Sequence, residues 1–171
     1  PSQPHGTKDG YFLLLASPNP KTSQTAVLPK DIVLVIDRSG SMSANDKIEQ
    51  AKDALSFILK NRNAEDRFEV VMFNDSIEPF FDELIAADTE HIDQALDEVE
   101  RIEARGSTNI HEALQTAMKL LKGSSGQRPA YVIFLTDGLP TTGPRDEGQI
   151  IKDTSKANTD KARLFALGVG Y

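Results

Sequence analysis

Oxygen-bearing side chains stand at alternate positions in one short segment of this chain. Asp37, Ser39 and Ser41 are each two residues apart, and Gly40 lies among them. If the segment curls into a loop, all three side chains can point at one centre, and the glycine supplies the backbone freedom that the curl needs. Carboxylate and hydroxyl oxygens are the ligands of hard cations. The spacing therefore predicts part of a divalent-metal site.

Two further segments offer oxygen atoms of the same kind. One is Thr-Asp-Gly at 136–138, which contains Asp137, and the other is Gly-Ser-Thr-Asn at 106–109, which contains Thr108. Together the three segments supply two carboxylates and three hydroxyls, with no His or Cys. This set favours Mg²⁺, Mn²⁺ or Ca²⁺ over softer metals.

The elements that must position these residues follow from hydrophobic patterning. Short apolar runs alternate with segments whose apolar residues recur at helical spacing. The expected strands are 11–16, 31–36, 68–73, 77–81, 131–135 and 163–168. The expected helices centre on 48–59, 92–102, 110–121 and 147–157. The alternation predicts an α/β fold with a doubly wound, mostly parallel sheet flanked by helices.

The carboxyl ends of the parallel strands are where ligands bind in such a sheet. Asp37 directly follows the strand expected at 31–36, and Asp137 follows the strand expected at 131–135. We expect these two strands to be neighbours, which would bring the two carboxylates together across 100 residues of sequence. The strand at 77–81 is expected at an edge because it contains a proline.

Each of these features also has a purely structural interpretation. Ser39 and Ser41 could be turn or cap residues of the helix that follows. Thr108 or Asn109 could cap the next helix, with Glu112 completing a capping box. A hairpin turn at the second aspartate is disfavoured, because a proline follows soon after and no alternating strand comes next. Taken jointly, at the strand ends of this architecture, the features favour a site.

Composition bounds the remaining function classes. The chain has 171 residues, a net charge of −7, 6% aromatic residues and no cysteine. The length suits one compact domain, and the missing cysteine excludes disulfides, thiolate zinc sites and cysteine nucleophiles. The acidic balance argues against a nucleic-acid partner, and no apolar run reaches the roughly 20 residues that span a bilayer. No transmembrane segment or signal peptide is therefore predicted, and the start at Pro1 suggests an excised fragment.

The negative charge is concentrated in one stretch. Residues 82–103 hold nine acidic residues against one arginine, a net of −8 where the whole chain carries −7. Because such a run on a helix is usually a solvated face, we interpret it as one.

Three motifs together resemble the metal-ion-dependent adhesion site of von Willebrand factor type A domains: Asp-x-Ser-x-Ser at 37–41, Thr108 before a helix, and Thr-Asp-Gly at 136–138 after a buried strand. The resemblance covers 31–171 in order. The amino-acid sequences of 31–42, 106–110 and 135–143 are similar to those of the branch that includes inter-alpha-trypsin inhibitor heavy chains and their prokaryotic relatives. The segment 9–18 resembles the stretch that joins the preceding domain to this one in that branch.

This resemblance implies a role for each residue of the motif. Ser39, Ser41 and Thr108 would contact the metal directly, and Asp37 and Asp137 would act directly or through water. The metal is usually Mg²⁺ in the family, with Mn²⁺ or Ca²⁺ as alternatives. One coordination position stays open for an Asp or Glu of a protein partner. The family further implies a binding or adhesion module without enzymatic activity, outside the cell or at its surface.

The same resemblance sets the expected domain organisation. Residues 1–30 are interpreted as a linker with one short strand at 11–16, and 31–171 as the domain. The family fold ordinarily has a further strand and helices after the Gly-Val-Gly of 168–170. Either the domain is incomplete at its C-terminal side, which we favour, or the strand at 11–16 takes the place of the missing one.

A metal-dependent phosphoryl transferase or hydrolase on a similar sheet is the alternative function. Phosphatases of that kind need a second Asp two residues after the first, where this chain has Ser39. A serine nucleophile is disfavoured because no Gly-x-Ser-x-Gly elbow is present and the histidines, His5, His91 and His111, fall in the N-terminal tail and on two expected helices.

Two other functions fit the same residues less well. A calcium EF-hand starting at Asp37 fails because Met42 stands where the loop needs Gly, and Ile48 where it needs Glu. A regulatory module of an ATP-driven metal-insertion complex is disfavoured by the similarity of 9–18 to the secreted or surface branch.

Overall fold

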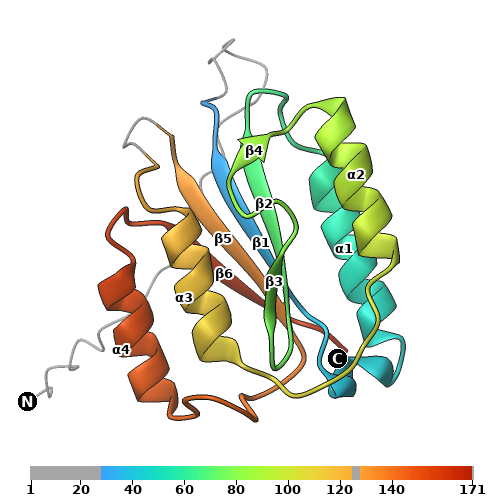
Figure 1. Cartoon of the computed structure of the whole chain (residues 1–171), viewed down its shortest axis with the longest axis vertical. Helices are drawn as coiled ribbons and strands as arrows, with labels where there is room; N and C mark the ends of the chain where they lie inside the picture. The colour runs from blue at the N-terminus through green and yellow to red at the C-terminus, as the bar shows by residue number, and fades with distance from the viewer. Residues whose placement is uncertain (1–27, 125–127, 171) are drawn as a thin grey trace, which may run out of the picture.

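The computed structural model describes residues 28–124 and 128–170, and its centre is one twisted sheet (Figure 1). The strands follow the order β3-β2-β1-β5-β6, and β4 pairs with β2 outside this path. The parallel strands are β1 (Asp31–Asp37), β2 (Arg67–Phe73), β5 (Ala130–Thr136) and β6 (Arg163–Gly168). The strands β3 (Ile77–Pro79) and β4 (Ile85–Ala86) run antiparallel to β2.

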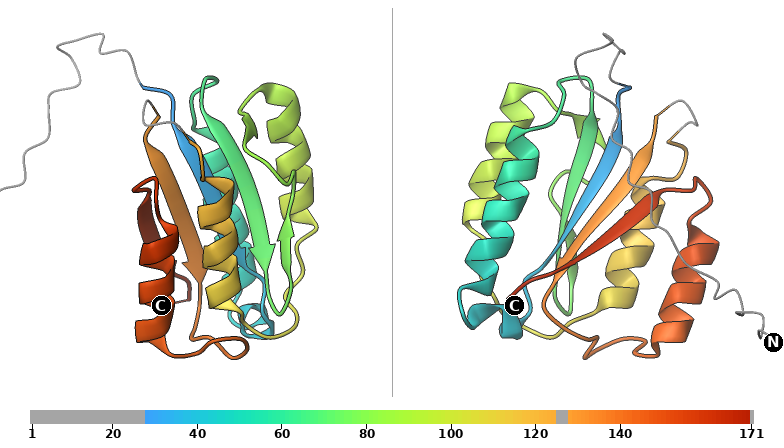
Figure 2. Two further views of the ribbon diagram at one scale, coloured as in Figure 1. Left: turned by 60° about the vertical axis from the view of Figure 1, so that its left-hand side comes forward. Right: turned by 180° about the vertical axis from the view of Figure 1, so that it is seen from behind.

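Helices cover both faces of this sheet (Figure 2). They are α1 (Lys47–Lys60), α2 (Thr89–Glu100), α3 (Ile110–Leu120) and α4 (Glu147–Ala157). α1 and α2 pack together on one face, and α3 and α4 pack together on the other. The predicted α/β class with a doubly wound, mostly parallel sheet is confirmed.

The central strand β1 explains why the fold has two cores. Its side chains alternate between the faces: Leu34 and Ile36 join the cluster under α1 and α2, and Val33 and Val35 join the cluster under α3 and α4. All four are at most 1% exposed. A continuous apolar run is what a strand buried on both faces requires, and this is the pattern that the sequence shows.

The element boundaries differ from the predictions in a few places. β3 ends at Pro79 instead of continuing to residue 81. The Phe80 N–H still bonds to the Val70 carbonyl of β2, but the Phe81 N–H turns to the Glu69 carboxylate. α2 ends at Glu100, and the next N–H groups bond back within its last turn. The two-residue β4 was not predicted. The expected strand at 11–16 lies outside the described residues.

β3 ends the strand order, as the proline in its sequence predicted. None of the helices in the described part of the chain has the length and apolar composition needed to cross a membrane.

Candidate metal centre

The predicted site lies where β1 and β5 end side by side, at the bottom of the sheet in Figure 1. Ile36 pairs with Leu135, so Asp37 and Thr136 end neighbouring strands. The Thr136 hydroxyl donates a hydrogen bond of 2.6 Å to Asp37 Oδ2. The expected neighbourhood of these two strands is therefore confirmed, and a side-chain contact joins their ends.

The loop after β1 curls as its spacing predicted. Asp37 Oδ1 accepts a hydrogen bond of 2.7 Å from the Ser39 N–H, and a 3₁₀ turn follows at Gly40–Ser43. The hydroxyls of Ser39 and Ser41 are 3.1 Å apart, and the Ser41 hydroxyl donates to Asp137 Oδ1 at 2.8 Å. A chain of hydrogen bonds thus joins four of the five predicted residues.

The two serines do lie at a turn, as the structural interpretation allowed, but their interpretation as helix caps is not supported. Ser39 precedes the 3₁₀ turn but makes no side-chain cap hydrogen bond, and Ser41 directs its hydroxyl to Asp137. α1 begins only at Lys47, after Asp46.

Thr108 lies in a third loop, which is fastened to the first one by backbone hydrogen bonds. The Gly40 N–H donates to the Gly106 carbonyl at 2.9 Å, and the Arg105 N–H donates to the Arg38 carbonyl at 2.7 Å. Thr108 is 4% exposed. The described structure shows no hydrogen bond from its hydroxyl to the other four residues, so Thr108 is brought to the same edge without joining their network.

Gly106 is needed for the close approach of this third loop. Its φ of +78° is in the region that favours glycine, and a Cβ there would lie 2.1 Å from Asp75 Oδ1. Asn109, next to Thr108, is the cap of the helix α3. Its side-chain oxygen accepts a hydrogen bond of 3.3 Å from the Glu112 N–H, and its side-chain NH₂ donates to the Glu112 carboxylate at 2.8 Å. Because Asn109 caps α3, the Thr108 hydroxyl is not used in the cap.

Both carboxylates of the site are withdrawn from water. Asp37 is fully buried, and the Asp137 side chain is 1% exposed. Burial raises the pKa of the Asp37 carboxyl, hydrogen bonds from Thr136 and Ser39 act in the opposite direction, and the negative charge of Asp137 raises it further. Two buried carboxylates beside each other repel, so a cation between them is favoured.

Sequence reasoning missed one cation that already lies at this site. Lys47 Nζ is 2.8 Å from Asp137 Oδ2. Lys47 stands at the start of a helix, where the helix dipole disfavours positive charge. This position indicates that Lys47 has an acidic partner, but the sequence does not show which residue that partner is.

The donor set at the loops fits a hard divalent cation. Nowhere in 28–124 or 128–170 do three His, Cys, Asp or Glu residues gather as a metal-binding group. The predicted site has only two carboxylates, and its other oxygen atoms are hydroxyls, so it is not such a group. Its oxygen atoms suit Mg²⁺ or Mn²⁺.

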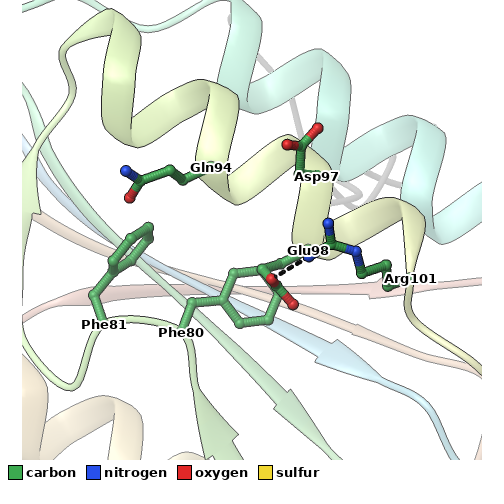
Figure 3. Close-up of a pocket in the computed structure, with 6 residues that line it drawn as sticks. All are labelled: Phe80, Phe81, Gln94, Asp97, Glu98 and Arg101. Atoms are coloured by element: carbon green, nitrogen blue, oxygen red, sulfur yellow. Dashed lines mark hydrogen bonds and ion pairs between the residues drawn. The ribbon is translucent and has the colours of Figure 1, made fainter.

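A hollow on the surface, away from the candidate metal centre, shares no residue with these loops (Figure 3). It has a volume of about 420 Å³ and lies between the segment after β3 and the helix α2. Its lining consists of Phe80, Phe81, Gln94, Asp97, Glu98 and Arg101. Glu98 and Arg101 form an ion pair of 2.6 Å within it.

All nine acidic residues of 82–103 are exposed, which confirms their interpretation as a solvated face.

Comparison with known sequences connects this geometry to a family. The family model for the von Willebrand factor type A domain matches residues 32–139. Inter-alpha-trypsin inhibitor heavy chain H4 of Homo sapiens is 33% identical over 170 residues, and heavy chain H2 of Homo sapiens is 33% identical over 169 residues. These matches cover 96% and 95% of this chain but only 18% and 17% of the relatives.

Solved structures with the same fold come from several organisms. A von Willebrand factor type A protein from Catenulispora acidiphila has a TM-score of 0.68 at 25% identity, covering 81% of this chain and 32% of that one. Manganese-loaded TRAP protein of Plasmodium vivax has a TM-score of 0.65 at 21% identity, covering 84% and 58%. The pilus adhesin SpaC from Lactobacillus rhamnosus GG has a TM-score of 0.60 at 23% identity, covering 69% and 16%.

Proposed function

Because this chain belongs to the von Willebrand factor type A domain family and is of the inter-alpha-trypsin inhibitor heavy chain type, we propose that it is a cation-dependent protein-binding module. Asp37, Ser39, Ser41, Thr108 and Asp137 would hold the cation, which would be Mg²⁺ or Mn²⁺. The module has no enzymatic activity in this proposal, and it acts outside the cell or at the cell surface.

The observation that carries the proposal is the hydrogen-bonded group of Asp37, Ser39, Ser41 and Asp137. It joins residues up to 100 positions apart in the sequence, and it does so where this fold binds ligands. Hydroxyls are neutral ligands, so only the two carboxylates would offset the charge of the cation. The bound cation would supply an attachment point for a carboxylate oxygen, and the partner would present an Asp or Glu to it.

The chain's own residues have separate parts in this binding. Asp37 is held by Thr136 and by the Ser39 backbone, so it fixes the curl of the first loop. Ser41 aligns Asp137 through its hydroxyl. The manganese-loaded state of the TRAP protein supports divalent-ion binding by a domain of this fold, and the likeness to a pilus adhesin supports the proposed localisation.

The enzymatic alternative is disfavoured by the same geometry. Ser39 lies where a phosphatase with an aspartate nucleophile at Asp37 would need its second aspartate. The two described histidines contact carboxylates elsewhere: His91 pairs with Asp88 and His111 pairs with Asp153. No imidazole among the described residues is therefore placed to act on a molecule at the loops.

Titration with MnCl₂ and MgCl₂ tests this proposal. We expect the wild-type chain to bind the ion and to gain thermal stability from it. Asp37→Asn should weaken the affinity by about 100-fold, because it removes a charged oxygen from the ion's surroundings. Calorimetry and thermal melting, with and without chelator, measure both effects.

The matched control is Asp97→Asn, which makes the same change of charge at an exposed residue of α2. This variant should bind the ion as the wild type does. A wild-type chain that neither binds the ion nor changes its melting temperature would overturn the proposal, as would an equal loss of affinity in both variants.

A further inference from the structure

Lys47 satisfies one oxygen of the Asp137 carboxylate from inside the chain. Its Nζ lies 2.8 Å from Oδ2, and the Ser41 hydroxyl lies 2.8 Å from Oδ1. The Lys47 side chain is 18% exposed and the Asp137 side chain 1%. Both carboxylate oxygens therefore already have partners, and one partner carries a full positive charge.

The methylene stem of Lys47 is packed in place by the segment that follows β6. Gly170 has a φ of +90°, and a Cβ built on it would lie 2.6 Å from Lys47 Cε and 2.8 Å from Cγ. The Val169 N–H donates to the Thr136 carbonyl at 3.1 Å, which fastens this segment to the end of β5. Gly170 thus packs against the Lys47 stem more closely than a residue with a Cβ could, and this packing directs the ammonium at Asp137.

The local structure gives no other reason for a lysine at this position. Lys47 is the first residue of α1, where the dipole of the helix favours acidic residues. The preceding Asp46 has a φ of +56° and makes no side-chain cap hydrogen bond. The charge is therefore unfavourable to its own helix and is compensated by the carboxylate at the strand end.

We propose that Lys47 is an internal counter-ion that neutralises Asp137 in the metal-free domain and competes with the divalent cation for that carboxylate. This inference rests on the proposed function of the site. A cation that approaches Asp137 must displace the ammonium or share the carboxylate with it. The lysine then lowers the affinity of the site and stabilises the loops when no metal is bound.

The test uses Lys47→Met, which keeps an unbranched apolar stem beside Gly170 and removes the charge. We expect the affinity for Mn²⁺, measured by calorimetry and by the electron paramagnetic resonance signal of the free ion, to rise about tenfold. The melting temperature in chelator should fall, because Asp137 loses its partner. The rise in melting temperature upon adding Mn²⁺ should therefore be larger than in the wild type.

Two further variants distinguish competition from general effects. Lys47→Arg keeps the charge and should bind Mn²⁺ as the wild type does. Lys60→Met makes the same change of charge at the exposed end of the same helix and should leave the affinity unchanged.

The outcomes separate this inference from the proposed function. If the wild type binds Mn²⁺ and Lys47→Met binds it equally or more weakly, the counter-ion role is overturned and the metal site stands. If neither protein binds Mn²⁺, both the proposed function and this inference are overturned.

Discussion

Carboxylates gather in two regions of this domain, and the two regions differ in almost every physical respect. At the loops below β1 and β5, Asp37 and Asp137 are buried and share hydrogen bonds with serine and threonine hydroxyls. In 82–103 there are nine acidic residues, all exposed. The smaller group has the geometry of a binding site, so convergence and burial matter more than the number of charges.

The difference follows from the elements that carry the acids. Neighbouring parallel strands in fixed register end at the same edge, so residues that follow them must meet. Successive residues of a helix instead point about 100° apart, and the apolar face of α2 takes the inward directions. Its acids therefore spread over the water-facing side, where salt screens them.

Glu69 sharpens this comparison because it is a buried carboxylate whose acidic neighbour, Asp82, is exposed. It is 0% exposed in β2, and it accepts backbone hydrogen bonds from Val70, Phe80 and Phe81. Burial raises the pKa of Glu69 from 4.5 to about 7, against the lowering effect of these hydrogen bonds, and the charge of Asp82 contributes to the rise. Burial, with a smaller contribution from the charge of Asp82, thus raises the pKa of a structural carboxyl to about 7.

The largest expected effect on stability concerns Glu69. Because the pKa of Glu69 is higher in the folded chain, the folded state binds more protons between about pH 4.5 and 7. The stability that protonated Glu69 contributes is complete at pH 4.5 and is lost as the pH rises through 7. Glu69→Gln should remove about 2 kcal/mol of this pH dependence. Urea unfolding at pH 5 and pH 8, in chelator, measures the difference between the two proteins.

The isosteric amide keeps an oxygen for the backbone N–H groups, so the variant is expected to fold. Equal slopes of stability against pH in the two proteins would contradict the assignment to Glu69. Glu69 would then have the same pKa in the folded and unfolded chains, and its carboxylate would be buried in the charged form.

The sequence predicted those parts of the molecule that depend on local pattern. The run of apolar residues at 31–36 predicted a strand buried on both faces. The spacing of Asn109 and Glu112 made Asn109 one of two candidates for the cap of α3, and Asn109 is the cap. Lys47 and Glu69 could not be predicted in the same way. Lys47 pairs with a residue 90 positions away, and Glu69 is compensated by a turn 12 positions later.

Asp88 carries the next expected effect, within the acidic region itself. Its carboxylate accepts a hydrogen bond of 3.0 Å from the His91 N–H and so caps α2. This hydrogen bond lowers the pKa of Asp88. Asp88→Ala should lower the melting temperature by about 3 °C, since it leaves a helix N–H without its partner. Metal affinity should not change.

The control for this substitution is Asp93→Ala, at an exposed position within the same helix. It should not lower the melting temperature, because this position makes no cap and Ala favours the helix. An equal loss in both variants would show that the effect comes from charge and not from the cap.

The smallest expected effect belongs to the exposed acids that neither cap nor pair. Asp93 and Asp97 are four residues apart on α2, so they repel as neighbours on one helix face. The double variant Asp93→Asn, Asp97→Asn keeps shape and helix propensity while removing this repulsion. We expect the melting temperature to rise by about 1 °C at low ionic strength, and the gain to vanish in 0.5 M NaCl because salt screens exposed charges. Since Asp97 also lines the hollow beside Phe80 (Figure 3), the same variant probes that surface. A loss of Mn²⁺ binding in this variant would show that the two regions are not separate, because only convergent, buried carboxylates should respond to the ion.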